Sequence, residues 1–304
     1  MLVEQNCVKT ALNTAGLTLL ADSGESFLIK AIYVGEVTTA GYLNVKVDNT
    51  TVACYRVAGK RGNELGGMRY LYEGMNVMKI LVDKGLPFAI PIAEGQKLTL
   101  PILDGEGYLQ VVYDRYTAGD IRDDMPNGTK AKRYGFIQYL DASAVITESG
   151  DMLLDVSESP AEYPNFPAGR VVPPKMSITI LGISGSPFAD AASLNNCFYT
   201  KYLKLIRDRN VLFDEDRNGI LFLGTDGATA AGNRKNGVSI IGSCGEVSVS
   251  QNYYQIKPPF MFETPLKFES GEELLVYLTL VKVGTHTLPA DLPDIGLIMQ
   301  VDRE

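Results

Sequence analysis

The sequence predicts an all-β protein built from two tandem antiparallel β-sandwich or jelly-roll domains. Two observations lead to this prediction. First, runs of Thr, Val, Ile, Tyr and Phe recur along the 304 residues, separated by Gly, Asn-Gly and Asp-Gly turn signals about every ten residues. Second, segments of the first half return in the second half in the same order. The length allows two domains of about 150 residues, each with its own core.

The clearest repeat is a strand with the turn that follows it. Residues Tyr42–Asn49 (YLNVKVDN) return as Tyr202–Arg209 (YLKLIRDR), at an offset of 202 − 42 = 160 positions. An earlier strand repeats at an offset of 176 − 27 = 149, and a later Gly turn with its strand at 271 − 95 = 176. Unequal loops would explain the drifting offset, and so would coincidence. A duplicated β unit indicates a building block rather than a catalyst.

The first sandwich is predicted over residues 1–120. Its strands are expected at 27–34, 42–47, 98–103 and 108–113, with Asp104-Gly-Glu-Gly as a turn between the last two. The stretch 42–47 alternates cleanly, with apolar Leu, Val and Val on one face and Asn and Lys on the other. Such alternation is typical of an antiparallel sheet with one face in water.

Residues 121–133 are expected to be a linker. They are polar and turn-rich, and Asn127-Gly128 has the composition of a type I′ turn. Lys130, Lys132 and Arg133 form a local basic spot, which is best interpreted as part of a solvated turn.

The second sandwich is predicted over residues 134–304. A proline-rich loop at 157–175 holds five prolines and is expected on the surface, available to neighbours. Residues 198–208 fit a helix or a strand, and the repeat favours a strand. A three-residue apolar run at 211–213 and a four-residue run at 220–223 predict a hairpin. The tail 291–301 predicts an edge strand. The further strands expected are 134–140, 176–183, 237–241, 246–250 and 274–283, with 142–147 as a strand or one helical turn.

Composition narrows the class of partner. The net charge of −8 disfavours nucleic-acid binding by the surface as a whole. No window is apolar enough for a transmembrane span, and the N-terminus lacks the pattern of a signal peptide, so synthesis in the cytoplasm is expected. The four cysteines, Cys7, Cys54, Cys197 and Cys244, have no paired spacing and are expected to be free thiols.

No catalytic constellation is visible. His286 is the single histidine and lies in a turn-like segment, where it would have to act alone. The segment around Ser184 lacks the second glycine of a nucleophile elbow, and both it and the segment around Cys244 are interpreted as turns or bulges. We therefore predict no catalytic residue, no metal, no cofactor and no enzymatic activity. Tyr253-Tyr254 are interpreted as structural or interface tyrosines rather than as a sugar platform.

The most specific local signal is an acidic loop. Asp214, Asp216 and Asn218, followed by Gly219, match the start of a calcium-binding loop. The glutamate expected at position 12 is replaced by Thr225. Calcium binding therefore stays open, and a charged hairpin turn that caps its own backbone is the favoured interpretation.

In its duplication and strand spacing the chain resembles the double-jelly-roll capsid proteins of tailless icosahedral viruses. The resemblance rests on the repeats at Tyr42–Asn49 with Tyr202–Arg209 and at Pro87–Leu98 with Pro259–Leu274. It implies two upright jelly rolls per chain and trimers that form pseudo-hexagonal capsomers in a virion. Neighbouring virion proteins would be partners, and Lys130, Lys132 and Arg133 would be candidates for facing an internal viral membrane.

Two alternatives remain open at this stage. The same β units would serve a decoration, turret or fibre-base protein of a virion. A carbohydrate- or calcium-binding β-sandwich module is the other alternative, although the absence of tryptophan weakens the sugar-binding version. The sequence favours the self-assembling capsid subunit.

Overall fold

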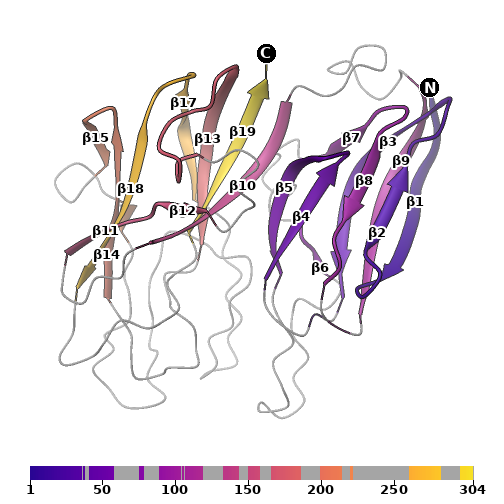
Figure 1. The fold of residues 1–304 in the computed structure, drawn as a ribbon, viewed down its shortest axis with the longest axis horizontal. Helices are drawn as coiled ribbons and strands as arrows, with labels where there is room; N and C mark the ends of the chain where they lie inside the picture. Colours follow the sequence, from indigo (N-terminus) through magenta and orange to yellow (C-terminus); the bar gives the residue numbers. More distant parts are fainter. Residues whose placement is uncertain are drawn as a thin grey trace, which may run out of the picture. The chain divides into compact units, whose positions relative to one another are not determined.

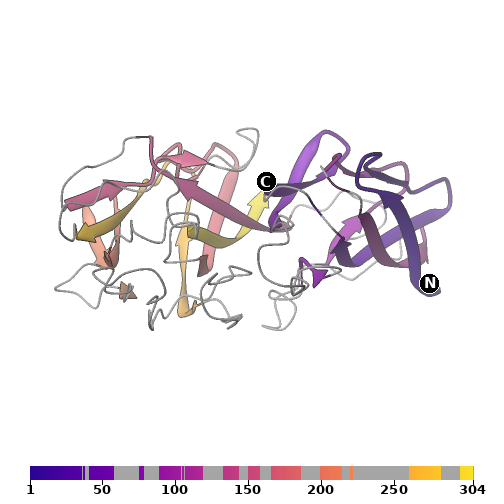
Figure 2. The same ribbon diagram turned by 90° about the horizontal axis from the view of Figure 1, so that it is seen from below.

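The structure is a computed structural model of the chain. It describes residues 1–35, 37, 41–57, 75–78, 89–103, 105, 107–118, 133–143, 150–157, 166–185, 199–213, 220–221, 260–281 and 295–303. All regular elements in these ranges are β-strands, and they form antiparallel sheets (Figure 1 and Figure 2). The all-β antiparallel fold predicted from the sequence is confirmed.

The chain divides into two compact units, Met1–Phe136 and Ile137–Glu304. The sequence places the linker at 121–133, just before this division, and residues 119–132 lie outside the described ranges. Each unit is described by itself below.

The first unit is a jelly roll. The nine strands described in it are β1 (Leu2–Leu12), β2 (Leu17–Leu20), β3 (Glu25–Val34), β4 (Gly41–Val47), β5 (Thr50–Val57), β6 (Met75–Asn76), β7 (Ile90–Ile92), β8 (Lys97–Leu100) and β9 (Tyr108–Thr117). One sheet has the order β1-β9-β3-β6, with β7 also on β3, and the other has the order β2-β8-β4-β5. The chain therefore crosses repeatedly between two antiparallel sheets, which is the double-sheet jelly-roll arrangement.

The second unit repeats this order. Its strands are β10 (Arg133–Asp141), β11 (Gly150–Leu153), β12 (Val156–Ser157), β13 (Met176–Gly185), β14 (Tyr199–Arg207), β15 (Asn210–Phe213), β16 (Ile220–Leu221), β17 (Phe260–Phe268), β18 (Leu274–Val281) and β19 (Ile295–Arg303). One sheet runs β12-β10-β19-β13-β17 and the other β11-β18-β14-β15, with β16 also on β14. Apart from the added β12 and β16, each strand has a counterpart in the first unit, where β6 and β7 together correspond to β17.

The core of each unit lies between its sheets and follows the alternation of the strands. In β4, Leu43, Val45 and Val47 are at most 3% exposed, whereas the residues between them are partly exposed. In β18, Leu274, Val276 and Leu278 are buried in the same alternating manner. The predicted apolar face of 42–47 is thus the face that lines the core.

The duplication extends to the register of individual residues. In β3 the pairing with β9 shifts between Ile29 and Ala31, and in β13 the pairing with β19 shifts between Ile180 and Gly182. Both irregularities therefore occur at an offset of 180 − 29 = 151. The offset of 149 predicted from the sequence was wrong by two residues.

Longer loops in the second unit explain why the offset drifts. It is 151 at β3 and β13, then 208 − 48 = 160 at the next hairpin loop, 271 − 95 = 176 at the Gly turn, and 303 − 117 = 186 at the last strand. Each step is an insertion between two matching strands. The repeat is not a coincidence, because equivalent residues of the two units have equivalent hydrogen-bond partners as well as similar residue types.

The predicted hairpin of 211–213 with 220–223 is wrong. Leu205 of β14 pairs with Phe213 of β15, and Leu203 pairs with Ile220 of β16. Both short strands thus run antiparallel to β14 along the same edge, and they do not pair with each other. The hairpin in this region is formed by β14 and β15, with Asp208-Arg209 as its two-residue loop.

Two further predictions for the second unit need correction. The tail strand β19 pairs with β13 and lies between β13 and β10 in the sheet, so it is a central strand and not an edge strand. The proline-rich segment 157–175 is not surface loop throughout, because Phe166 and Val172 are buried. Residues 158–165, together with the predicted elements at 142–147, 237–241 and 246–250, lie wholly or mostly outside the described ranges.

Candidate functional site

Most residues singled out by sequence fall outside the described ranges. This holds for the acidic loop with Asp214, Asp216 and Asn218, for His286, for Tyr253 and Tyr254, for Cys197 and Cys244, and for Lys130 and Lys132. Arg133 is the first residue of β10. The calcium, platform and membrane-contact hypotheses therefore stay predictions.

The remaining sequence candidates lie in strands. Ser184 is part of β13 and pairs with Gly296 of β19, so the expected turn at Ser184 is wrong. Cys7 and Cys54 form no disulfide, as predicted, and burial is the main cause that raises the pKa of the Cys7 thiol. Within the described ranges, no group of three or more His, Cys, Asp or Glu side chains is placed to hold a metal ion. Those ranges also contain no helix with the length and apolar character of a membrane span.

The best-defined polar site of the first unit joins three of its loops. Asp48, in the loop between β4 and β5, accepts a hydrogen bond from the backbone N–H of Lys97 at 3.0 Å. Gln96 accepts one from the N–H of Ala93 at 3.0 Å and donates one to Asp48 Oδ2 at 3.3 Å. The N–H of Ala21, which directly follows β2, donates to the Gln96 carbonyl oxygen at 3.0 Å. We call these five residues the first clamp.

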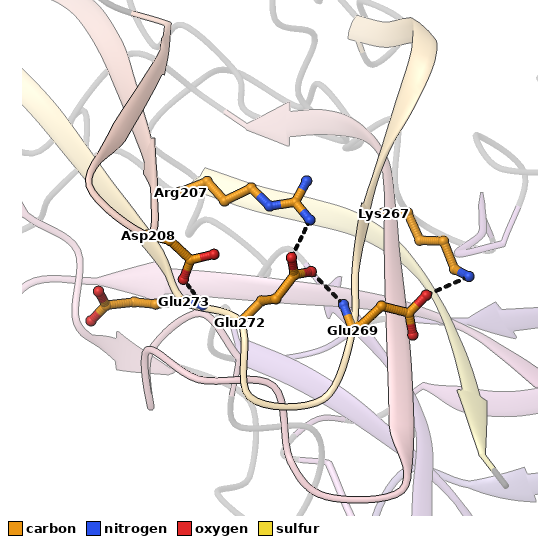
Figure 3. A network of polar contacts seen from close by, with 6 residues as sticks. All are labelled: Arg207, Asp208, Lys267, Glu269, Glu272 and Glu273. Atoms are coloured by element: carbon orange, nitrogen blue, oxygen red, sulfur yellow. Dashed lines mark hydrogen bonds and ion pairs between the residues drawn. The ribbon is translucent and has the colours of Figure 1, made fainter.

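The second unit contains a second clamp of the same design (Figure 3). Asp208 accepts a hydrogen bond from the N–H of Glu273 at 2.8 Å, as Asp48 does from Lys97. The carboxylate of Glu272 accepts one from the N–H of Glu269 at 2.6 Å, as Gln96 does from Ala93. The N–H of Val172 donates to the Glu272 carbonyl oxygen at 3.0 Å, as Ala21 does to Gln96. The five residues of the second clamp therefore occupy the same five roles.

Local conformation explains why these residue types recur. Asp48 and Asp208 have φ values of 54° and 45°, in the left-handed region that Asp tolerates better than most residues. The neighbouring turns contain Gly95 and Gly271 with φ values of 76° and 89°, where glycine has no steric penalty. The carboxylates and the Gln96 amide satisfy backbone N–H groups that the turns would otherwise leave unpaired.

The two clamps differ in charge. The buried residue at the centre of the first clamp is the neutral Gln96, which is 5% exposed. Its counterpart Glu272 is ionic, and the guanidinium of Arg207 donates to its carboxylate (Figure 3). The ammonium of Lys267 contacts the Glu269 carboxylate at 2.6 Å on the same loop. The second clamp is thus an ion-pair network at a position where the first clamp uses an amide.

The pKa values of the second unit reflect these contacts. The hydrogen bond from Arg207 is the main cause that lowers the pKa of Glu272, and the Glu269 N–H adds to it. The hydrogen bond from the backbone of Ser143 lowers the pKa of Asp155. Burial acts to raise the pKa of Asp151, but the Thr279 hydroxyl and the Lys204 ammonium together outweigh it and lower that pKa.

These lowered pKa values predict that acid destabilises the second unit. A carboxyl group with a lowered folded-state pKa stabilises the fold above its unfolded-state pKa of about 4 and loses this contribution as the pH falls through the folded-state value. We expect the free energy of unfolding to fall as the pH drops from about 4.5 to about 2.5, by roughly 0.5 kcal/mol for each of these partly exposed groups. Urea unfolding at a series of pH values measures this dependence.

The variant Glu272→Gln provides a matched control because it gives the second clamp the amide of the first. At neutral pH the variant should be slightly less stable than the wild type, since the charged Arg207 then contacts an uncharged amide instead of a carboxylate. Its stability should then depend less on pH between about 4.5 and about 2.5. An unchanged pH dependence in the variant would contradict the assigned role of Glu272.

The clamps were not predicted from the sequence, although parts of them were. The repeats contain Asp48 and Asp208 and the two Gly turns, but the sequence alone does not show that the Asp and the Gly turn meet in space. The signal that could have found the clamps is the shared spacing, in which an Asp directly follows a repeated strand and Gly-Gln or Gly-Glu opens the turn before the next repeated strand.

Comparisons with known proteins add little to what the structure says about function. No protein-family model and no curated protein matches the chain. Solved structures of a peptide-N(4)-(N-acetyl-β-D-glucosaminyl) asparagine amidase, of recombinant PNGase F, and of PNGase F from Flavobacterium meningosepticum align at TM-scores of 0.30, 0.29 and 0.29. They are 11–13% identical, and the alignments cover 99–100% of this chain and 93–94% of theirs. Likeness at this level carries no argument about function.

Proposed function

We propose that this protein is a viral structural protein, a capsid shell subunit that self-assembles as trimers. The observation that carries the proposal is the duplicated jelly roll, which matches in strand order, in bulge position and in clamp hydrogen bonds. A chain with two equivalent jelly rolls supplies six similar blocks per trimer, which suits the pseudo-hexagonal capsomers of the viral family that the sequence resembles.

The physical properties of the fold support this role. In each jelly roll the two sheets cover one another, and the loops at their ends are left to make contacts. The clamps fix three loops at one end of each unit, which limits the entropy that those loops would lose on contact with a neighbour. The proposal places the protein in the virion after synthesis in the host cytoplasm, with neighbouring virion proteins as its partners and no catalytic role.

Light scattering on the purified protein, coupled to size-exclusion chromatography, tests the proposal. We expect a stable trimer at micromolar concentration, and sheets or shells in negative-stain electron microscopy when the protein is concentrated. A protein that stays monomeric at every concentration and binds calcium or a sugar would overturn the proposal in favour of a binding module. A ring or trimer that never tiles would favour a decoration or turret protein instead.

A further inference from the structure

The outer face of β1 and β9 is open to solvent although it carries large apolar side chains. The register pairs Val8 with Val112 and Leu12 with Tyr108, so these four side chains share one face. Between them Thr10 receives a hydrogen bond from Gln110, and that contact is exposed. Val8, Leu12 and Tyr108 are 53%, 47% and 56% exposed, whereas Leu109 and Val111 point the other way and are buried in the core. We call these six outward residues the open face: Val8, Thr10, Leu12, Tyr108, Gln110 and Val112.

The second unit shows the same face in a covered state. Val112 pairs with Ala31 at the bulge of β3, and its counterpart Ile298 pairs with Gly182 at the bulge of β13. Ile298 is fully buried, and all residues of β10 from 137 to 140 are buried, whereas β1 is exposed along most of its length. The matching surface of the second unit is thus buried. The comparison indicates that the open face is built to be covered.

The edge of β1 is protected against pairing with a further strand. Asn6 has a φ of 54° at an irregularity of β1, and its N–H donates to the Asp114 carboxylate at 3.0 Å. Lys30 contacts the same carboxylate at 3.3 Å and thereby holds this bulge in place. Lys9 is exposed on the core side of the edge strand. A bulge and an inward-facing lysine are devices that prevent edge-to-edge pairing, so a partner has to approach the face.

The charge of the open face indicates which kind of partner this face fits. The six residues of the open face carry no charge at neutral pH, whereas the whole chain has a net charge of −8. A nucleic acid or an anionic lipid surface would require basic side chains that this face lacks. Copies of an acidic chain repel each other except where their surfaces are uncharged and apolar, and an apolar centre with few charges is the usual composition of an interface core.

We propose that the open face is the surface on which a second copy of this chain docks. This inference rests on the proposed function, because it assigns the self-assembly contact to named residues. The Leu12–Tyr108 and Val8–Val112 pairs supply the apolar part of the contact, and Thr10 and Gln110 between them supply its uncharged hydrogen-bonding groups.

The test compares two leucines of equal exposure in the same unit. Leu12→Glu places a carboxylate in the open face, and Leu20→Glu is the control, since Leu20 is 49% exposed on β2. We expect Leu12→Glu to weaken self-association by at least about tenfold, because a charge buried in an apolar contact has no partner. Leu20→Glu should assemble as the wild type does. Concentration series with light scattering measure both, and circular dichroism confirms that the variants are folded.

The outcomes separate this inference from the proposed function. If the wild type assembles and Leu12→Glu assembles equally well, or if both variants lose assembly equally, the open face is not the contact and the proposed function stands. If the wild type never assembles, the proposed function fails together with the inference. If Leu12→Glu fails to fold, two other tests replace it. One is the variant Tyr108→Ser, and the other is amide hydrogen exchange in β1 of the wild type. Protection of residues 8–12 that does not rise on assembly would then overturn the inference.

Discussion

Replacing Phe268 by alanine is expected to lower the free energy of unfolding of the second unit by about 4 kcal/mol. Phe268 ends β17 and is fully buried. Its ring centroid lies 5.4 Å from that of Phe166, which the loop before β13 supplies. The Arg207 guanidinium carbon lies 4.7 Å from the same ring centroid. One side chain therefore supports the core, the buried part of the proline-rich loop, and the arginine that pairs with Glu272 of the second clamp.

The effect should have a local signature as well as a global one. Without the ring, Phe166 and Arg207 both lose a packing partner, so amide protection should fall first at residues 166–175 and at the second clamp. Phe268→Leu is the matched control, because it keeps most of the apolar volume and should cost less than half as much. Urea unfolding gives the free energies, and hydrogen exchange gives the local pattern. A loss below about 1 kcal/mol for Phe268→Ala would show that the site collapses without strain.

Much of the fold could be predicted because antiparallel strands with one wet face leave an alternating pattern. Residues 42–47 alternate without interruption, and β4 follows them closely. Residues 198–208 were ambiguous for a physical reason. The pairing of β14 with β18 shifts between Thr200 and Tyr202, and an irregularity of this kind changes the phase of the alternation so that it imitates a helical pattern.

The strands that are missed or misplaced from the sequence are those whose place in the sheet depends on their partners. The N-terminal strand β1 went unpredicted because Asn6 interrupts its period and because both of its faces are largely exposed. The tail β19 was taken for an edge strand, although its continuous apolar run Ile-Gly-Leu-Ile-Met is the signal of a strand buried on both faces. The strands β15 and β16 imitate a hairpin because they follow each other closely in the sequence, and only their pairing with β14 shows that they continue along one line.

The candidate site was predictable only in part, for a related reason. The repeats contain the aspartates and the glycine turns of both clamps, but a hydrogen bond such as Asp48 to Lys97 joins residues 97 − 48 = 49 positions apart. Sequence periodicity describes neighbours along the chain, whereas the clamps depend on how separate loops converge. The duplication was the one feature that could have linked them, since it places the same residue types in the same roles twice.

Replacing Gly182 by alanine is expected to lower the free energy of unfolding of the second unit by about 3 kcal/mol. A Cβ atom on Gly182 would lie 2.4 Å from the carbonyl oxygen of Phe260 and 2.7 Å from the sulfur of Met261. The oxygen belongs to the backbone of β17, which pairs with β13 on both sides of this position. The added methyl group can therefore be accommodated only if two paired strands move apart.

The first unit supplies the control for this prediction, because its equivalent position is already an alanine. Ala31 lies at the matching bulge of β3, where β7 pairs with residues 27–29 and β6 with residues 33–34, so neither strand pairs with residue 31. The reverse change Ala31→Gly should therefore cost only about 0.5–1 kcal/mol, the usual cost of glycine within a strand. Equal losses for the two variants in urea unfolding would mean that the close approach of β17 does not set the requirement for glycine at position 182.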